Sequence, residues 1–179
     1  CIGDVMLDVI VRIDVAPQQI NYGSDTSAQI STGSGGAAGN VAAWLTRTPA
    51  RSTIVSRIGD DPAGAAIITE FDQLGVSHSD LTTKGKSSGV VIVLVDSSGE
   101  RTMFPDKGAN SFLEIADMPD LADFQAAYIS GYALLNPFAR PTVLSMIEKI
   151  KAGGIDIYFD PASVGAMKDV PDPELHSWL

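Results

Sequence analysis

Hydrophobic residues fall into short runs that alternate between strand-like and helix-like patterns. Residues 2–13 and 52–59 and the segments AAYISGY and IDIYFDPAS are rich in Val, Ile and aromatic residues and predict buried strands. Residues 37–47 and the segments DDPAGAAIITEFDQLG and PFARPTVLSMIEKIKAGG predict helices between them. Because strands that alternate with helices form parallel βαβ units, we expect an α/β fold with a mostly parallel central sheet flanked by helices.

Three strand-like segments do not fit this alternation. Residues 25–32 predict a polar strand, and residues 88–96 and 100–105 flank a short Ser-Ser-Gly turn. Two strands around such a turn form a hairpin. We expect these strands to build a small separate sheet beside the central one.

Composition and charge exclude several classes of partner. The chain has 179 residues, 45% of them hydrophobic and 19% charged, with a net charge of -10. An acidic surface disfavours nucleic acid and anionic membranes as partners. No apolar run approaches the roughly 18 residues that span a bilayer. We therefore expect one globular domain over 1–179, or one large piece of one. A small anionic ligand is not excluded, because backbone N–H groups can bind anions.

The cysteine content indicates the compartment of the protein, and the two ends of the chain indicate how much of the fold is present. Cys1 is the single cysteine, so there is no disulfide framework and a reducing cytoplasm is expected. The first residues, CIGDVMLDVIV, enter a strand at once, and the last, DPELHSWL, end on apolar residues. We interpret the chain as one part of a larger fold that continues beyond Leu179.

The first strand carries two acidic residues among apolar ones. In the segment GDVMLDVIV, strand alternation places Asp4, Met6 and Asp8 on one face. A buried carboxylate is costly unless it is paired or hydrated. For Asp4, either exposure at the strand end or a Ser or backbone N–H partner would suffice. For Asp8 we favour a ligand-facing role, because a carboxylate accepts hydrogen bonds from hydroxyl groups.

The segment STGSGGAAGNVAAWL combines glycines with an Asn at the start of a helix. Gly33, Gly35 and Ala38 fit the dinucleotide-binding fingerprint G-x-G-x-x-A, which would indicate an oxidoreductase domain. That fingerprint should follow the first strand directly, whereas here about twenty residues intervene, and it gives no reason for Asn40. A glycine turn that merely starts a helix is a further alternative.

The order of several motifs resembles one family. GDVMLD, GGAAGN, IGDDPAG, LGV, SGVVIVLVDSSGERT and GAN occur in the order seen in ribokinase-like carbohydrate kinases of the PfkB family. The resemblance covers about residues 2–168. It implies a ribokinase-like α/β fold with a small β-sheet lid, here roughly residues 12–34 and 86–107. It also implies transfer of phosphate from ATP, with magnesium, to a hydroxyl of a sugar, nucleoside or related small molecule.

The resemblance also implies residue roles. The acid of the first strand, Asp8, and the helix-start residues Gly35, Gly36 and Asn40 would bind the acceptor. Asp160, in FDPAS, could join a phosphate or magnesium network, although an Asp before Pro is also an ordinary turn starter.

Charged lid residues and the lid edge suggest further contacts. Arg101 and Lys107 could meet an anionic substrate, but we interpret them as solvated lid charges. An exposed lid edge makes a homodimer plausible.

One family motif is missing from the printed sequence. The resemblance places the catalytic Asp in a Gly-Ala-Gly-Asp motif toward the C-terminus, and this chain contains none. We therefore expect this chain to hold the lid and the acceptor-binding half of a kinase, and to be inactive alone. A non-catalytic sugar-binding module is the remaining alternative.

Overall fold

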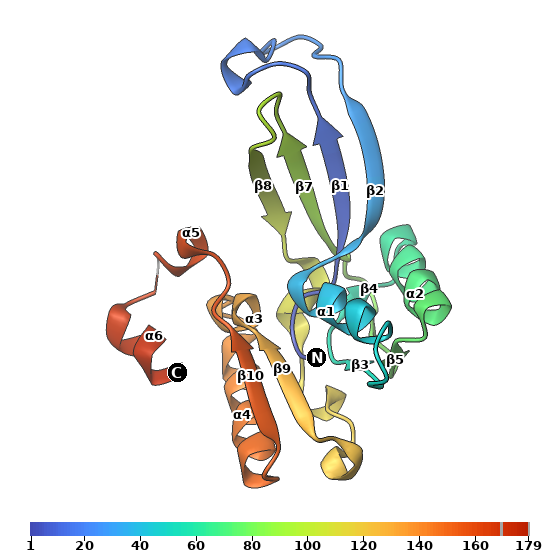
Figure 1. Ribbon diagram of the computed structural model, residues 1–179, viewed down its shortest axis with the longest axis vertical. Helices are drawn as coiled ribbons and strands as arrows, with labels where there is room; N and C mark the ends of the chain where they lie inside the picture. Colours follow the sequence, from blue (N-terminus) through green and yellow to red (C-terminus); the bar gives the residue numbers. More distant parts are fainter. Residues whose placement is uncertain (169, 179) are drawn as a thin grey trace.

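A parallel layer and a four-stranded sheet at one of its ends organise the molecule. The computed structural model describes residues 1–168 and 170–178. Figure 1 shows the four-stranded sheet projecting from the layer, with helices α1 and α2 on one side of its base and the chain's C-terminal segment on the other. The strands are β1 Met6–Arg12, β2 Gln29–Gly35, β3 Thr53–Ile54, β4 Ile58–Gly59, β5 Ser77–His78, β6 Thr82–Thr83, β7 Gly89–Val95, β8 Arg101–Asp106, β9 Ala126–Ser130 and β10 Asp156–Asp160.

Helices connect the strands of the parallel layer. The α-helices are α1 Ala37–Leu45, α2 Pro62–Leu74, α3 Gly131–Leu135, α4 Arg140–Ala152, α5 Val164–Met167 and α6 Asp172–Trp178. Four 3₁₀ helices cover Pro17–Gln19, Gly108–Phe112, Ile115–Asp117 and Leu121–Asp123. Helix α2 has the expected ends: the Asp61 side chain accepts from the Gly64 N–H at 2.9 Å, and Gly75 is left-handed.

The first predicted strand is divided between two sheets. Ile2 forms parallel bridges to Val55 and to Ile129 of β9, and β9 pairs in parallel with β10. Met6–Arg12 instead enters the four-stranded sheet, whose order is β2-β1-β7-β8. The expectation of one continuous buried strand over residues 2–13 is therefore wrong. Hydrophobic patterning could not reveal the change of sheet, because both halves of the segment are apolar.

Other element boundaries also differ from the sequence expectations. The expected strand 52–59 is two short strands, β3 and β4, which pair in parallel with β5 and β6. The expected polar strand 25–32 begins and ends later, as β2, and includes two of the glycines. The hairpin over 88–96 and 100–105 is present as β7 and β8, paired antiparallel.

Two apolar clusters stabilise the parallel layer. One lies between α4 and strands β9 and β10, with Ile129, Leu134 and Met146 at its centre. The other lies beneath α1 and α2 and contains Ile67 and Phe71. Burying side chains of this size contributes roughly 1.5–3 kcal/mol each. The two clusters fix the base from which the four-stranded sheet projects.

Candidate functional site: the base of the four-stranded sheet

The carboxylate of Asp8 lies directly over Gly35. Strands β1 and β2 pair antiparallel, with Met6 opposite Gly35 and Asp8 opposite Gly33. A Cβ atom on Gly35 would overlap both carboxylate oxygens of Asp8. Gly35 is thus required for the position of Asp8, which is an intramolecular reason for this glycine that sequence analysis did not find.

Gly36 joins the start of α1 to the segment before β1. Its φ of 84° is left-handed, and a Cβ there would overlap the backbone carbonyl of Asp4. The same Asp4 carbonyl accepts from the Gly39 N–H at 3.3 Å. Gly36 and Gly39 therefore allow α1 to lie against the segment that precedes β1. The first turn of α1 carries Asn40, whose side chain is exposed.

One oxygen of Asp8 has no partner within the described chain. Asp8 Oδ1 is buried, and no hydrogen-bond donor among residues 1–168 and 170–178 reaches it. Burial raises the pKa of the Asp8 carboxyl above its ordinary value, because desolvation penalises the charged form. A buried acceptor without a donor is rare in folded proteins and calls for an explanation.

Asp4 and Lys107 form an ion pair where the four-stranded sheet meets the parallel layer. Asp4 is 3% exposed, and its Oδ2 pairs with the Lys107 ammonium. That ammonium also lies 4.8 Å from the centre of the Tyr132 ring. Lys107 is therefore not a solvated charge. Asp4 is neither exposed at the strand end nor satisfied by a Ser or a backbone N–H, so both expectations for Asp4 were wrong. Arg101 is exposed, as expected.

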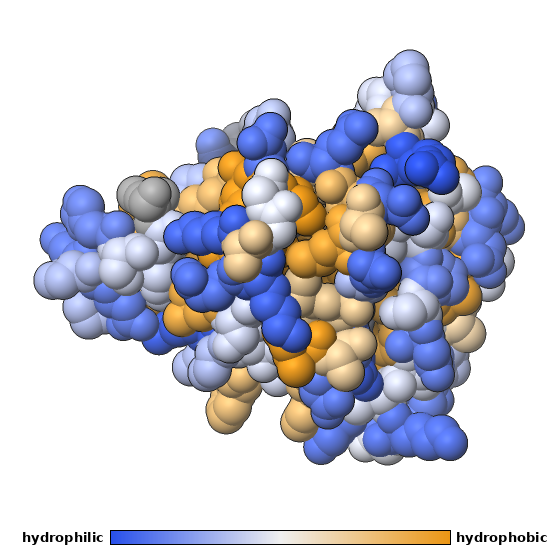
Figure 2. Space-filling model, turned by 90° about the horizontal axis from the view of Figure 1, so that it is seen from below, coloured by the Kyte–Doolittle hydropathy of each residue, from blue (hydrophilic) through white to orange (hydrophobic). Residues whose placement is uncertain are grey.

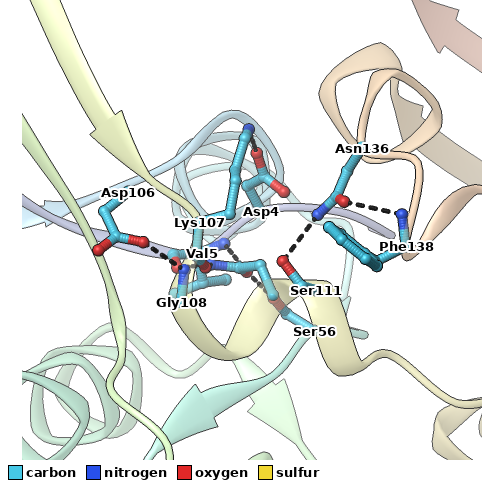
Figure 3. A network of polar contacts seen from close by, with 10 residues as sticks. Asp4, Val5, Ser56, Asp106, Lys107, Gly108, Ser111, Asn136 and Phe138 are labelled. Carbon is cyan, nitrogen blue, oxygen red and sulfur yellow. Dashed lines mark hydrogen bonds and ion pairs between the residues drawn. The ribbon is translucent and has the colours of Figure 1, made fainter.

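Asn110 holds the same junction through four hydrogen bonds. Figure 3 labels its partners Val5, Ser56 and Lys107, which lie where the end of β8 meets the segment before β1. The Asn110 amide donates to the carbonyls of Val5 and Lys107, both at 2.9 Å, and accepts from the Val5 N–H at 2.9 Å and the Ser56 hydroxyl at 3.0 Å. Sequence reasoning used Asn110 only within the GAN motif and assigned it no structural role.

Asp160 lies at the carboxyl end of β10 and has two partners. It accepts from the Tyr128 hydroxyl at 3.0 Å and from the Ala162 N–H at 2.9 Å, the latter closing a turn over Pro161. Burial and the neighbouring carboxylate raise the pKa of Tyr128, so its hydroxyl remains a donor at neutral pH. The turn-starting alternative thus describes the local geometry, and a phosphate or magnesium role stays a prediction.

The described residues do not by themselves fit a magnesium site. Over residues 1–168 and 170–178, no group of three or more His, Cys, Asp or Glu side chains is placed to hold a metal ion. Asp160 is a single carboxylate whose two oxygens are already engaged.

Two surface hollows lie away from Asp8 and Asn40. One is lined mainly by apolar residues, including Cys1, Ile2, Val55, Leu121 and Phe124. Figure 2 views the molecule from the end opposite the four-stranded sheet and shows apolar side chains gathered on that face. The other hollow lies at the start of α2, around Asp60 and Asp61.

Within the described part of the chain, no helix is both long and apolar enough to cross a membrane.

The architecture defines a ribokinase-like α/β protein. Adenosine kinase from Sinorhizobium meliloti superposes with a TM-score of 0.81 at 21% identity, over 98% of this chain and 59% of that one. An uncharacterized sugar kinase from Pyrococcus horikoshii, solved in complex with ATP, gives 0.80 at 23% identity, over 98% and 57%. The expected fold is confirmed, with a parallel layer and a mixed four-stranded sheet.

The sequence comparison specifies the family. The model of the pfkB family carbohydrate kinases matches residues 1–176, and the chain belongs to that family. A fructokinase from Klebsiella pneumoniae is 34% identical over 131 residues, which cover 71% of this chain and 42% of that protein. The chain thus spans less than half of that relative. The family resemblance inferred from the motifs is confirmed.

Proposed function

We propose that the whole protein transfers phosphate from ATP to a hydroxyl of a sugar, nucleoside or related small molecule. Family membership supports the reaction class. Among the similar proteins are a fructokinase, an adenosine kinase and a sugar kinase solved with ATP, which supports ATP as donor and a small hydroxyl-bearing acceptor. In this proposal the present chain supplies the acceptor-binding half.

The buried, unpartnered Oδ1 of Asp8 is the observation that carries the proposal. An acceptor hydroxyl would donate to this oxygen and relieve the cost of leaving it unpaired. Asn40, exposed on the first turn of α1, would offer a donor and an acceptor to neighbouring hydroxyls. Gly35 and Gly36 would contribute to acceptor binding by admitting the Asp8 carboxylate and the Asp4 backbone carbonyl beside them, which holds Asp8 at the proposed site.

The four-stranded sheet would act as a lid that excludes water from the transferring phosphate. ATP would supply the phosphoryl group, and Asp160 is the residue of this chain proposed to lie near its phosphates. Phosphoryl transfer depends on positioning and charge stabilisation. Because the Gly-Ala-Gly-Asp motif is missing from the printed sequence, we propose that these 179 residues alone do not catalyse transfer.

The dinucleotide-binding alternative has little support in this geometry. In that fingerprint the glycines form a turn between a parallel strand and a helix. Here Gly33 and Gly35 lie inside β2, which pairs antiparallel with β1. The non-catalytic sugar-binding module would share the Asp8 site, and it differs from the kinase only in the absence of turnover by the whole protein.

The test is acceptor kinetics of the full-length protein with Asp8→Ala. We expect the acceptor KM to rise by roughly tenfold or more, the equivalent of one strong hydrogen bond, while the KM for ATP stays close to that of the parent. Asp14→Ala, at an exposed position in the loop after β1, is the matched control. Unchanged acceptor kinetics in Asp8→Ala would remove Asp8 from the site.

A further inference from the structure

The buried ion pair between Asp4 and Lys107 is not explained by its contribution to the stability of the fold. Asp4 is almost fully buried, and Lys107 keeps about a quarter of its side chain exposed. A buried ion pair contributes little net stability compared with apolar residues of similar volume, because both charges must be desolvated. Its presence at the base of the four-stranded sheet therefore points to a role in what the neighbouring site binds.

The pair is linked to the proposed acceptor site through the backbone of Asp4, Gly36 and Gly35. The Asp8 carboxylate lies over Gly35, and the next residue, Gly36, lies against the Asp4 carbonyl. The Asp4 carboxylate pairs with Lys107, which lies over the Tyr132 ring. Figure 3 shows the Lys107 side chain, from the end of β8, reaching the Asp4 carboxylate beside the segment that leads into β1.

The charges of this region give an acidic balance. Two carboxylates and one ammonium leave one net negative charge when all three groups are ionised. An unpaired lysine would attract a carboxylate or phosphate group on the acceptor. With Asp4 already bound to the ammonium, an anionic acceptor would meet the Asp8 carboxylate with no free cation beside it, and like charges brought together are strongly unfavourable.

We propose that Asp4 makes this site selective for uncharged acceptors by occupying the Lys107 ammonium. The inference rests on the proposed kinase function and narrows its substrate class to neutral sugars, polyols or nucleosides. Sugar acids and sugar phosphates of the same skeleton are excluded by charge. Asp4 is a specificity-determining residue in this scheme and takes no part in the transfer itself.

The experiment compares matched acceptors with the full-length protein at saturating ATP. The pairs are fructose with fructose 6-phosphate, glucose with gluconate, and adenosine with adenosine 5′-monophosphate. For the pair whose neutral member is used best, we expect kcat/KM to favour that member by about tenfold or more. A wild-type preference for the anionic member would overturn the inference and leave the kinase function intact. Turnover of no acceptor at all would overturn the proposed function, and this inference with it.

Variants separate a selectivity role from a structural one. Asp4→Asn frees the Lys107 ammonium, and we expect the kcat/KM ratio of anionic to neutral acceptor to rise by roughly tenfold. Asp4→Glu keeps the charge and should keep the parent ratio. Asp72→Asn, on the surface of α2, is the matched control. A lower melting temperature in Asp4→Asn with an unchanged ratio would contradict the proposal.

A double variant covers the case in which Asp4→Asn does not fold. Asp4→Asn combined with Lys107→Met leaves no unpaired buried charge, which avoids the main cause of destabilisation. It also removes the cation that would attract an anion. We expect this protein to keep the preference for neutral acceptors, and a gain of activity toward anionic acceptors would contradict the inference.

Discussion

The carboxylate of Asp8 occupies the space that a side chain on Gly35 would fill. Two strands that pair antiparallel thus place an acidic residue and a glycine in contact across the sheet. The contact explains why a glycine stands at this position of β2, although glycine weakens a strand. It also makes the position of Asp8 sensitive to a single methyl group on the neighbouring strand.

We expect Gly35→Ala to displace Asp8. The new methyl group would overlap the carboxylate, so the free energy of unfolding should fall by about 1–3 kcal/mol and the acceptor KM of the full-length protein should rise. Gly33→Ala is the control, because no heavy atom of the described chain outside its neighbours lies within 4 Å of a Cβ there. Chemical denaturation and acceptor titration measure the two effects. Equal behaviour of the two variants would contradict the contact.

Asp8→Asn should stabilise the protein at neutral pH while weakening acceptor binding. Burial raises the pKa of Asp8 in the folded state, so the folded protein binds a proton more readily than the unfolded chain does. Stability from this group is therefore complete below the unfolded pKa of about 3.9 and is lost as pH rises through the folded pKa. Melting temperatures of parent and variant should differ at pH 7 and converge toward pH 3.5. A less stable variant at pH 7 would contradict this expectation.

Tyr128→Phe should destabilise the carboxyl end of the parallel layer. It removes a hydrogen bond of 3.0 Å to the Asp160 carboxylate, and bonds to charged groups contribute about 1.5–3 kcal/mol. Tyr158→Phe, on the adjacent strand β10, is the matched control because Tyr158 is 63% exposed. Urea denaturation compares the two. A loss in the Tyr158 variant as large as that in the Tyr128 variant would show that the bond to Asp160 is not the cause.

Asn110→Ala should lower the stability of the fold, whereas Asn40→Ala should raise the acceptor KM and leave stability unchanged. Removing Asn110 leaves the buried N–H and carbonyl of Val5 unpaired, at a cost of about 1–3 kcal/mol for each group, so stability should fall sharply. Asn40 is exposed on a helix, where Ala is favourable, so stability should be kept while the acceptor KM rises. Thermal unfolding and acceptor kinetics of the full-length variants test both expectations. Comparable stability losses would refute the distinction.

A homodimer through the four-stranded sheet should depend on its face opposite Asp8. By strand register this face carries Ile30, Ile92 and Phe104, all exposed apolar side chains. We expect sedimentation velocity to show a dimer that Phe104→Glu dissociates, because a charge in an apolar interface is costly. Phe138→Glu, at an exposed Phe outside this sheet, is the control. A parent protein that stays monomeric at high concentration would reject the dimer.

Local patterns predicted much of the fold because they report local structure. The N-cap Asp61 and the stop at Gly75 defined α2 closely, and the Ser-Ser-Gly turn defined the β7–β8 hairpin. The change of sheet after Ile2 was not predictable, because it depends on which distant strands pair with each half of the segment.

Sequence analysis could predict a site residue only where the residue type was unusual for its position, as for an acid in an apolar strand. An acid among apolar strand residues indicated a special role for Asp8, and its unpartnered oxygen fits that interpretation. The partner of Asp4 lies 103 residues away in the chain, and no local pattern could have paired it with Lys107. The glycines of β2 suggested an approaching ligand, whereas the structure also gives each of Gly35 and Gly36 an internal neighbour.

The division of residues 2–12 between two sheets has a mechanical consequence. Ile2 is fixed in the parallel layer, and Asn110 binds both backbone groups of Val5, so a rotation of the four-stranded sheet would pivot close to Val5. At about 3.3 Å per strand residue, Asp8 lies about 10 Å from that pivot and Arg12 about 23 Å. A given rotation would therefore move the far end of the sheet more than twice as far as Asp8. Rotation of the sheet about Val5 would thus displace Arg12 far more than the Asp8 carboxylate.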